Sequence, residues 1–367
     1  MAAAARHSTA QARPAHSAAG SPVRPGTSTR RPNTRRMQVR SSLPCCRASI
    51  TQRAPVHLRR AGRMRAAAHA APIELDGFRE RVQECNLQAP QLEQLRTFVP
   101  FVVQSQQAGL LRPEFAAQLC ATFPAVFERH DASVALVASL QTPQARTDAV
   151  GACMRRLRDD GRISGWRDEL FPVATAFDEE PLLMLERAAA PFFGIRAYGV
   201  HVNCFTRSAD GRLDLWVARR SRTKQTFPLM LDHMVAGGLG HGLSPSATVV
   251  KECGEEAGVP EQLAAKACPV GFVSYMTMVP DGVKRDVLYV YDLELPHEFV
   301  PMVVDGEVEE FMHWPVQQVA DTVRTTRSFK PNCNIVLIDF FVRHGIITPE
   351  SRGFISLVAA LRSGDVA

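Results

Sequence analysis

The sequence predicts an α+β protein in which a mixed β-sheet is flanked by helices and is preceded by a smaller α+β module. Three observations lead to this prediction. Short apolar stretches bounded by turn residues alternate with amphipathic segments throughout residues 74–367. The regular strand pattern begins only near residue 181, which divides the body into two parts. The apolar content of 46% is ample for a buried core, and the length favours two domains.

Residues 1–70 are predicted to be a disordered transit peptide. Residues 1–73 contain 14 Arg, no Lys and no acidic residue, in a background of Ala, Ser, Thr and Pro. An Arg- and Ser-rich segment without a continuous apolar run is typical of an organelle-targeting peptide and not of a secretory signal. The Ser, Thr and Pro content favours a chloroplast (plastid), the arginines keep a mitochondrion as the alternative, and a plain disordered tail is the third interpretation. Cleavage is expected between Arg59 and Ala71.

The charge of the chain is unevenly distributed. The whole chain has a formal net charge of +6, but residues 74–367 carry 29 basic and 37 acidic groups, a net charge of −8. The basic pI therefore describes the leader, and it does not indicate binding to a nucleic-acid polymer. No apolar run approaches the roughly 18 residues of a membrane-spanning helix, so no membrane partner is expected. The nine Cys form no CxxC pair or metal-spaced Cys/His cluster, which favours free thiols.

The N-terminal module is expected over residues 74–175 and shows no catalytic signature. The spacing of apolar residues predicts a helix over 77–87 with Phe78, Val82 and Cys85 on one face. Two strands around a turn are expected at 98–103 and 108–111, and a helix opened by a proline from 113. A strand at 133–137, a helix at 144–157 and a last strand at 170–173 follow.

The second domain is expected over residues 181–365. Strands at 200–206 and 213–218 enclose a turn that contains Asp210 and Gly211, residues typical of a hairpin. Further strands are predicted at 234–236, 269–277 and 286–293, and helices at 316–324, 334–344 and 351–361. Together these elements form a mixed sheet between helices.

The residues suited to metal binding or catalysis are concentrated in 237–259. A glycine-rich loop leads to Ser244-Pro245, a good helix start, and Gly258 is a good helix stop. At about 100° per residue, Glu252, Glu255 and Glu256 fall within one arc of about 100°. Three neighbouring carboxylates repel one another unless a cation lies between them, and oxygen ligands suit Mg²⁺ or Mn²⁺. A solvated acidic stripe on an ordinary amphipathic helix is the simpler alternative, and the glycine loop argues against it.

This segment resembles the Nudix box, in which Gly, five residues, Glu and seven residues precede Arg-Glu-aliphatic-x-Glu-Glu-x-Gly-aliphatic. Gly237 and the block from Glu252 to Val259 match the pattern. Leu243 stands where the family has its first Glu, Lys251 stands where it has Arg, and Cys253 takes the aliphatic place. Segments near 198–203, 216–228, 286–296 and 305–311 are similar to the Nudix branch related to the domain fused to fungal thiamine pyrophosphokinase, which has plant plastid members.

The resemblance implies a Nudix α/β/α sandwich and hydrolysis of a phosphoanhydride bond with a divalent metal, Mg²⁺ or Mn²⁺. It assigns Glu252, Glu255 and Glu256 as metal ligands, with Glu255 or Glu256 also acting as catalytic base. A further acidic ligand is expected from another loop. Glu307 and Glu309 are the main candidates, with Glu310 as a third, and only those on one face of a strand can point inward.

Cations before the glycine loop are candidate phosphate ligands. Arg219, Arg220 and Lys224, with Arg222 between them, form this stretch, and a solvated strand end is the alternative. Gly237 and Gly238 would let the backbone approach a substrate or the catalytic helix closely. Aromatic platforms for an organic moiety are available at Trp166, Tyr198, Phe227 and Tyr275, although each is also an ordinary core residue. The histidines at 201, 241 and 344 are interpreted as structural or surface residues.

The expected partner is a small-molecule diphosphate, and the oligomeric state is left open. By resemblance, thiamine diphosphate and its oxidised analogues are the first substrates to consider, with the monophosphate as product. An oxidised nucleoside diphosphate such as 8-oxo-dGDP is the alternative substrate. The departures at Leu243 and Lys251 also leave a non-catalytic Nudix-fold binding module as an alternative.

Overall fold

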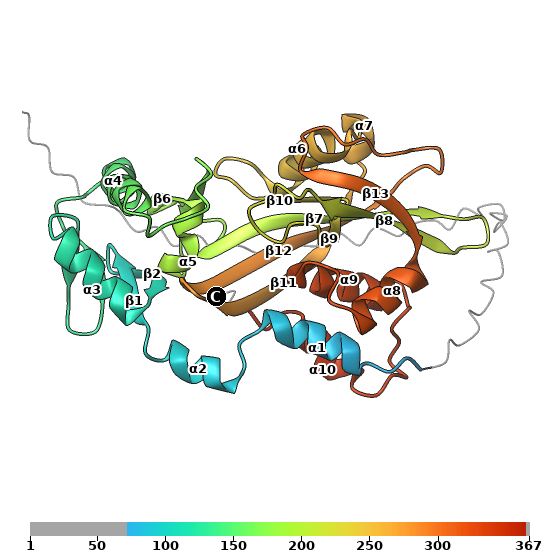
Figure 1. The fold of residues 1–367 in the computed structure, drawn as a ribbon, viewed down its shortest axis with the longest axis horizontal. Coiled ribbons are helices and arrows are strands. Elements are labelled where there is room, and N and C mark those ends of the chain that lie inside the picture. The colour runs from blue at the N-terminus through green and yellow to red at the C-terminus, as the bar shows by residue number, and fades with distance from the viewer. Residues whose placement is uncertain (1–71, 365–367) are drawn as a thin grey trace, which may run out of the picture. The chain divides into compact units, whose positions relative to one another are not determined.

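The structure is a computed structural model that describes residues 72–364, which belong to one unit (Figure 1). The predicted transit peptide and its cleavage site lie outside the described residues. Within 72–364, no helix is both long enough and apolar enough to span a bilayer.

The N-terminal part contains a four-stranded sheet in the order β2-β1-β4-β3, with β1 and β4 parallel. Its strands are β1 (Val99–Val103), β2 (Gln106–Leu111), β3 (Phe127–Arg129) and β4 (Val134–Leu136). The helices of this part are α2 (Ala89–Leu95), α3 (Pro113–Thr122) and α4 (Pro143–Asp159). Aromatic side chains fill its core, where the ring of Phe193 lies 5.0 Å from that of Phe101 and 5.6 Å from that of Phe115.

A second antiparallel pair, β5 (Leu170–Val173) and β6 (Leu183–Glu186), connects this part to the larger sheet. The 3₁₀ helix η1 (Arg187–Ala189) and the short helix α5 (Ala190–Phe193) follow it. Gly194 ends α5 with a φ of 53°, a left-handed conformation that suits glycine. Its neighbourhood leaves no room for a side chain, because a Cβ there would lie 2.5 Å from the Leu110 carbonyl oxygen.

The larger sheet has the order β11-β12-β7-β8-β13, with β10 paired to β7 and β9 paired to β8. Its strands are β7 (Arg196–Arg207), β8 (Leu213–Arg220), β9 (Leu231–His233), β10 (Val235–Gly238), β11 (Cys268–Val279), β12 (Gly282–Glu294) and β13 (Val308–Pro315). The strands β7 and β8 pair only between 205–207 and 213–215, next to their connecting turn. Beyond that point β7 pairs with β10, whereas β8 pairs with β9 and β13. The sheet therefore divides into two arms, one that contains β7 and β10 and one that contains β8, β9 and β13.

Helices cover both faces of this sheet (Figure 1). One face carries α6 (Pro245–Ala257) and α7 (Glu261–Ala264), and Val200, Val202 and Cys204 of β7 belong to the core beneath α6. The opposite face carries α1 (Asp76–Cys85), α8 (Val316–Thr325), α9 (Pro331–Arg343) and α10 (Phe354–Ala360). Alternate residues of a strand face opposite sides, and Phe205 accordingly packs 5.6 Å from Phe340 of α9. The predicted α/β/α sandwich with a mixed sheet is confirmed.

The helix at 77–87 lies elsewhere than its position in the sequence suggested. The sequence groups it with the N-terminal module, but α1 packs against α8 and α9 of the larger half, with the Phe78 ring 6.0 Å from that of Phe341. Its predicted apolar face is buried, since Phe78, Val82 and Cys85 are each at most 3% exposed. The amphipathic pattern therefore predicted the helix and its buried face but contained no information about its partner.

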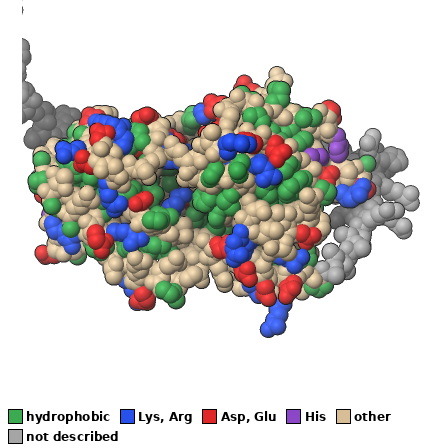
Figure 2. Space-filling view, in the orientation of Figure 1, with side chains coloured by type: hydrophobic (Ala, Val, Ile, Leu, Met, Phe, Trp, Pro, Cys, Tyr) green, Lys and Arg blue, Asp and Glu red, His purple; other side chains and the backbone are tan. Residues whose placement is uncertain are grey.

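On the face of the described residues that Figure 2 shows, Lys and Arg side chains are intermixed with Asp and Glu. No extended patch of one sign of charge is visible on that face.

Candidate active site

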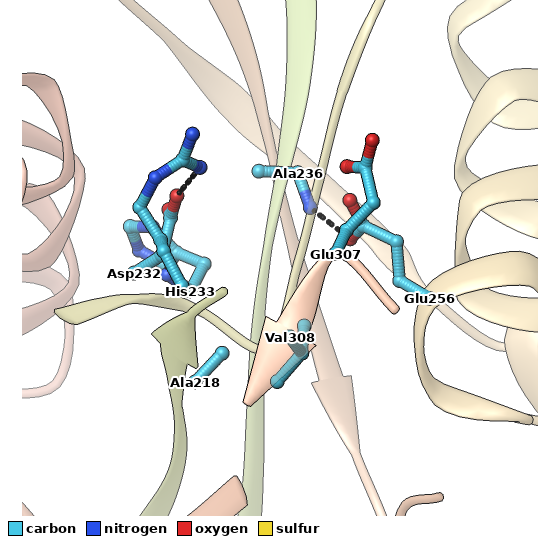
Figure 3. A pocket seen from close by; sticks show the side chains of 8 residues that line it. Ala218, Asp232, His233, Ala236, Glu256, Glu307 and Val308 are labelled. Carbon is cyan, nitrogen blue, oxygen red and sulfur yellow. Dashed lines mark hydrogen bonds and ion pairs between the residues drawn. The ribbon is translucent and has the colours of Figure 1, made fainter. Parts of the chain in front are cut away.

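The opening between the two arms of the sheet forms a pocket (Figure 3). It is lined by Ala218, Arg220, Asp232, His233, Ala236, Glu256, Glu307 and Val308. Figure 3 shows Glu256 and Glu307 on one side, with Asp232 and His233 across the gap. The pocket thus lies where strands that begin as neighbours separate, and residues from both arms face each other there.

The helix α6 has both of the ends that the sequence predicted. Ser244 caps its start by accepting a hydrogen bond from Ala247 N at 3.2 Å, and Pro245 is its first residue. Gly258 ends it with a φ of 64°, and its N–H returns to carbonyls of the last turn. On the inner face Val249 and Cys253 are at most 1% exposed and fix the helix on the sheet. The rigid packing of α6 fixes the direction of its three carboxylates.

Glu256 is the most buried of these carboxylates, at 8% exposed. Its Oε2 accepts a hydrogen bond of 2.9 Å from Ala236 N on β10, so the side chain reaches the pocket at the unpaired edge of that strand. Burial raises the pKa of Glu256 well above its usual range, and the backbone hydrogen bond only partly opposes this. A cation bound beside this carboxylate would favour its ionised form.

Glu252 packs against Gly237, and this contact explains the first glycine of the motif. A Cβ at position 237 would lie 2.5 Å from both Cγ and Cδ of Glu252. Any larger residue would therefore displace the carboxylate or the strand. Burial also raises the pKa of Glu252, with Lys251 acting in the opposite direction.

Glu255 is the outermost of the three, with its side chain 54% exposed. Lys251 Nζ lies 2.6 Å from Glu255 Oε2 and 3.2 Å from Glu252 Oε1, so the lysine that replaces the family's arginine still contacts the carboxylate group. Leu243, in place of the family's first glutamate, is 42% exposed and takes no part in this contact network.

The opposite arm holds the other predicted site residues, and here the charges are paired. Arg219 binds Glu310, Arg220 binds Asp232, Arg222 binds Glu309 and Lys224 binds Glu307. Of the candidate acids on β13 and just before it, Glu307 lines the same pocket as Glu256. Glu309 instead lies beside Arg222, which lowers its pKa. The cations predicted to bind phosphate are thus engaged with carboxylates in this structure.

A second polar cluster lies beneath the pocket and was missed by the sequence analysis. His201, Asp232, His233 and Cys333 are all buried, and one ligand atom from each lies within 4.8 Å of the others. Residues from β7, β9 and α9 meet there, and their separation of up to 132 positions gives no spacing signal in the sequence. His201 is buried as expected for a structural residue, but it has close polar partners that the sequence did not predict.

These four residues could hold a metal, but their side chains are already engaged in hydrogen bonds and ion pairs within the protein. Asp232 contacts Arg220 at 2.7 Å and Lys330 at 3.3 Å, and burial, which would raise its pKa, is outweighed by these two cations. Two positive charges on one carboxylate oppose a divalent ion at that position.

The two histidines of this cluster are linked by their Nδ1 atoms, which lie 3.0 Å apart. Asn203 Nδ2 donates to Asp292, so Asn203 Oδ1 is left to accept from His233 Nε2 at 3.1 Å. His233 therefore carries its proton on Nε2 and accepts from His201 through Nδ1. The cluster is a complete hydrogen-bonded network.

The aromatic candidates are spread over the molecule. Tyr275 is buried beside Asp286, and Trp166 donates to Asp168 at 2.7 Å. The Tyr198 ring lies 5.0 Å from Phe177. Phe227 is 42% exposed and has a φ of 52°, and Leu229 has a φ of 62°; both values are uncommon for residues other than glycine. Arg220 holds the Phe227 carbonyl at 3.0 Å, which stabilises this loop at the rim of the pocket.

Comparison with known proteins gave two family matches that meet at residue 197. A domain of unknown function, DUF4743, matches residues 77–197, and the NUDIX domain matches residues 197–333. The chain is 46% identical over 301 residues to "Nudix hydrolase 20, chloroplastic" of Arabidopsis thaliana, covering 80% of this chain and 79% of the relative. It is 45% identical over 294 residues to "Nudix hydrolase 24, chloroplastic" of the same plant, with the same coverage. An uncharacterised protein of Saccharomyces cerevisiae is 38% identical over 213 residues, or 54% of this chain and 61% of that protein.

Proposed function

Because the chain belongs to the Nudix hydrolase family, whose members use a divalent metal to cleave diphosphate bonds, we propose that α6 and the pocket beside it are its catalytic centre. The observation that carries this proposal is the position of Glu256, a buried carboxylate that lines the same pocket as Glu307. A buried acid with a raised pKa and a second acid lining the same pocket are costly for a fold and are expected at a functional site.

The residues present suit a hard divalent cation. Glu252, Glu255 and Glu256 offer carboxylate oxygens from one helix face, and Glu307 offers another from the opposite arm. Lys251 already bridges two of these carboxylates, which shows that a positive charge is stabilised between them. We assign the first three as metal ligands and Glu307 as the fourth, with Glu309 as a weaker candidate because it is not among the residues that line the pocket. Mg²⁺ is the proposed ion and Mn²⁺ its substitute.

When bound, the ion neutralises phosphate charge and activates a water molecule. The protein's own part is to place acceptors beside that water. Glu255 is the more accessible of the two proposed catalytic residues and can take the proton of the water, whereas Glu256 is held by Ala236 N and positions the site. Gly237 lets Glu252 approach closely, and Gly238 lets Phe171 and Arg187 approach the strand from the opposite face. Arg219, Arg220 and Lys224 would contribute to phosphate binding only by exchanging their present carboxylate partners.

The proposed substrate is a small diphosphate ester, first of all thiamine diphosphate or an oxidised analogue. The support is the similarity of segments within residues 198–311 to the branch related to the domain fused to thiamine pyrophosphokinase. We further propose that the protein acts in the plastid, because two relatives that align with 80% of the chain are named chloroplastic.

The test is phosphate release from thiamine diphosphate, oxythiamine diphosphate and 8-oxo-dGDP, with and without Mg²⁺. Glu255→Gln and Glu256→Gln should each lose turnover by orders of magnitude, whereas Glu261→Gln, an exposed acid on the neighbouring α7, should retain it. Turnover of 8-oxo-dGDP alone would overturn the substrate class but not the catalytic centre. Metal-independent turnover, or none with any diphosphate, would overturn the catalytic proposal.

A further inference from the structure

The N-terminal module touches the catalytic cleft at two points, one on each arm. On the β10 side, a Cβ at Gly238 would lie 3.2 Å from Glu169 Oε1 and Phe171 Cζ and 3.3 Å from Arg187 Nη1. On the other side, a Cβ at Gly165 would lie 3.4 Å from Gln225 Oε1, in the loop that leaves β8. The segment 165–169, which leads into β5, therefore spans from one arm of the divided sheet to the other.

The strand alternation of β10 puts this contact on the pocket side. Gly237 faces Glu252, so the residues on either side of it, Ala236 and Gly238, face the opposite way. Ala236 lines the pocket, and Gly238 contacts Arg187. Residues two apart on a strand are separated by roughly 7 Å. Arg187 thus contacts β10 two residues along the strand from Ala236, a pocket residue, and on the same face of the strand.

The bridging segment has a fixed shape. Glu186, only 3% exposed, accepts hydrogen bonds from Arg167 N at 3.0 Å and Ala188 N at 3.2 Å. Asp168 has a φ of 55°, a conformation that few residues other than glycine adopt. A buried carboxylate and an unusual backbone angle here are expected where a loop must present a side chain in one direction.

The side chain presented by this loop is that of Arg167. It is exposed, and its Nη1 donates to the carbonyl of Gly165 at 3.1 Å, not to a carboxylate. Partial burial and the neighbouring Arg187 both lower the pKa of Arg167, while Glu169, Glu186 and Glu307 raise it. The segment that carries Arg167 contacts Gln225 through Gly165, and Lys224 next to Gln225 pairs with Glu307, which lines the pocket. Arg187 N donates to the Glu169 carbonyl at 2.8 Å, so Arg167 and Arg187 belong to the same end of the β5–β6 pair, and two guanidinium groups there would attract an anion.

We propose that Arg167 and Arg187 of the N-terminal module bind the phosphate oxygens of the substrate that the metal does not contact. This inference rests on the proposed function and gives the module a role in it. The predicted cations Arg219, Arg220 and Lys224 have carboxylate partners, as Arg187 has in Glu169, whereas the Arg167 side chain donates to a backbone carbonyl. The module closes the cleft and supplies its anion-binding charge, which the Nudix half alone does not offer at this position.

The cleanest variant is Arg167→Gln in the leaderless protein, because this side chain is exposed. With thiamine diphosphate and saturating Mg²⁺, KM should rise about tenfold or more while kcat changes less than threefold, since one charge-assisted contact is worth about 1.5–3 kcal/mol. Arg187→Gln should behave similarly, although it also breaks the ion pair with Glu169. Arg156→Gln is the matched control, an exposed arginine of the same module that binds only Asp160.

A binding measurement separates this inference from the choice of substrate. Calorimetric titration with pyrophosphate and Mg²⁺ should show weaker binding to Arg167→Gln and unchanged binding to Arg156→Gln. Equal affinity of wild type and Arg167→Gln would overturn the inference, and so would an equal loss in the control, which would indicate a general charge effect. If pyrophosphate binding depends on Arg167 but thiamine diphosphate is not hydrolysed, the substrate proposal fails and the anion site stands.

Discussion

The two arms of the divided sheet use their charges differently. On α6 one lysine contacts two of the three carboxylates, and burial raises the pKa of Glu252 and Glu256. On the β8–β13 arm, each of the four predicted cations has its own acidic partner. The first arrangement is incomplete without another cation, whereas the second is complete as it stands. Unbalanced charge therefore identifies the catalytic wall better than the number of charged residues does.

The largest expected effect is the loss of turnover in Glu256→Gln. Removing this charge should lower kcat on the order of 10³-fold, because the residue is proposed both to bind the metal and to orient the site. The amide oxygen can still accept from Ala236 N, so the fold should persist. Without metal the variant should melt at a higher temperature than wild type, since it buries no charge. Thermal unfolding with EDTA and with Mg²⁺ checks this, and a lower melting temperature in EDTA would contradict the account of an unbalanced wall.

The balanced arm should respond in stability and not in metal dependence. Asp232→Ala leaves Arg220 and Lys330 without their shared carboxylate, and should cost about 3–5 kcal/mol in the free energy of unfolding. Glu310→Ala is the control, because its partner Arg219 is more exposed and such pairs contribute less than about 1 kcal/mol. Urea denaturation distinguishes the two. Similar small effects would show that Asp232 is not the electrostatic centre of this arm.

A methyl group at position 237 should disturb the catalytic wall without changing any charge. Gly237→Ala would bring a Cβ within 2.5 Å of Glu252, and a displacement of about 1 Å at a catalytic group can cost about 10²-fold in turnover. Gly254→Ala, on the same helix, meets nothing within 4 Å and should leave kcat unchanged while stabilising the helix slightly. Unchanged kcat in Gly237→Ala would show that Glu252 does not need this close packing.

The histidines beneath the pocket predict the smallest effect. Burial lowers the pKa of His233 to about 4, and that of His201 well below its usual range. A depressed histidine pKa stabilises the fold fully above about pH 6.5, and this stability is lost as pH falls towards pH 4. For His233 alone the loss between pH 7 and pH 5 is about 2 kcal/mol. His233→Gln, which can still donate to Asn203, should show a smaller difference between urea denaturation at the two pH values. An unaltered difference would mean that His233 is not the group that titrates.

The sequence predicted much of the fold because its signals were local. The caps at Ser244 and Gly258, the turn at Gly211 and the apolar face of α1 are each set by residues close in the chain, and all appear as expected. The face of α6 that carries the carboxylates follows from helix periodicity in the same way. That these carboxylates bind metal, and that domains divide at 175–181, remain predictions.

Pairings between distant segments were beyond the reach of such signals. Nothing near His201 in the sequence indicates Cys333, and nothing near Arg187 indicates Gly238. The cations at 219–224 looked free because their partners lie up to 91 residues away, on β9, on β13 and just before β13. Short-range patterns predict an element and its faces, whereas the occupant of each face is decided by tertiary packing.

Because Gly237 and Gly238 have no side chains, groups on the two faces of β10 are separated only by its backbone. The Glu252 carboxylate presses on one side of it at position 237, and the hairpin of the N-terminal module presses on the other at position 238. A substitution at either position would shift the strand and so disturb the group on its opposite side. The proposed metal ligand Glu252 and the N-terminal module are therefore coupled, and neither contact can change without affecting the other. Cutting the chain at residue 197 to isolate the Nudix half would leave one side of this thin wall bare, and we expect such a fragment to lose affinity for diphosphates even where its metal ligands remain intact.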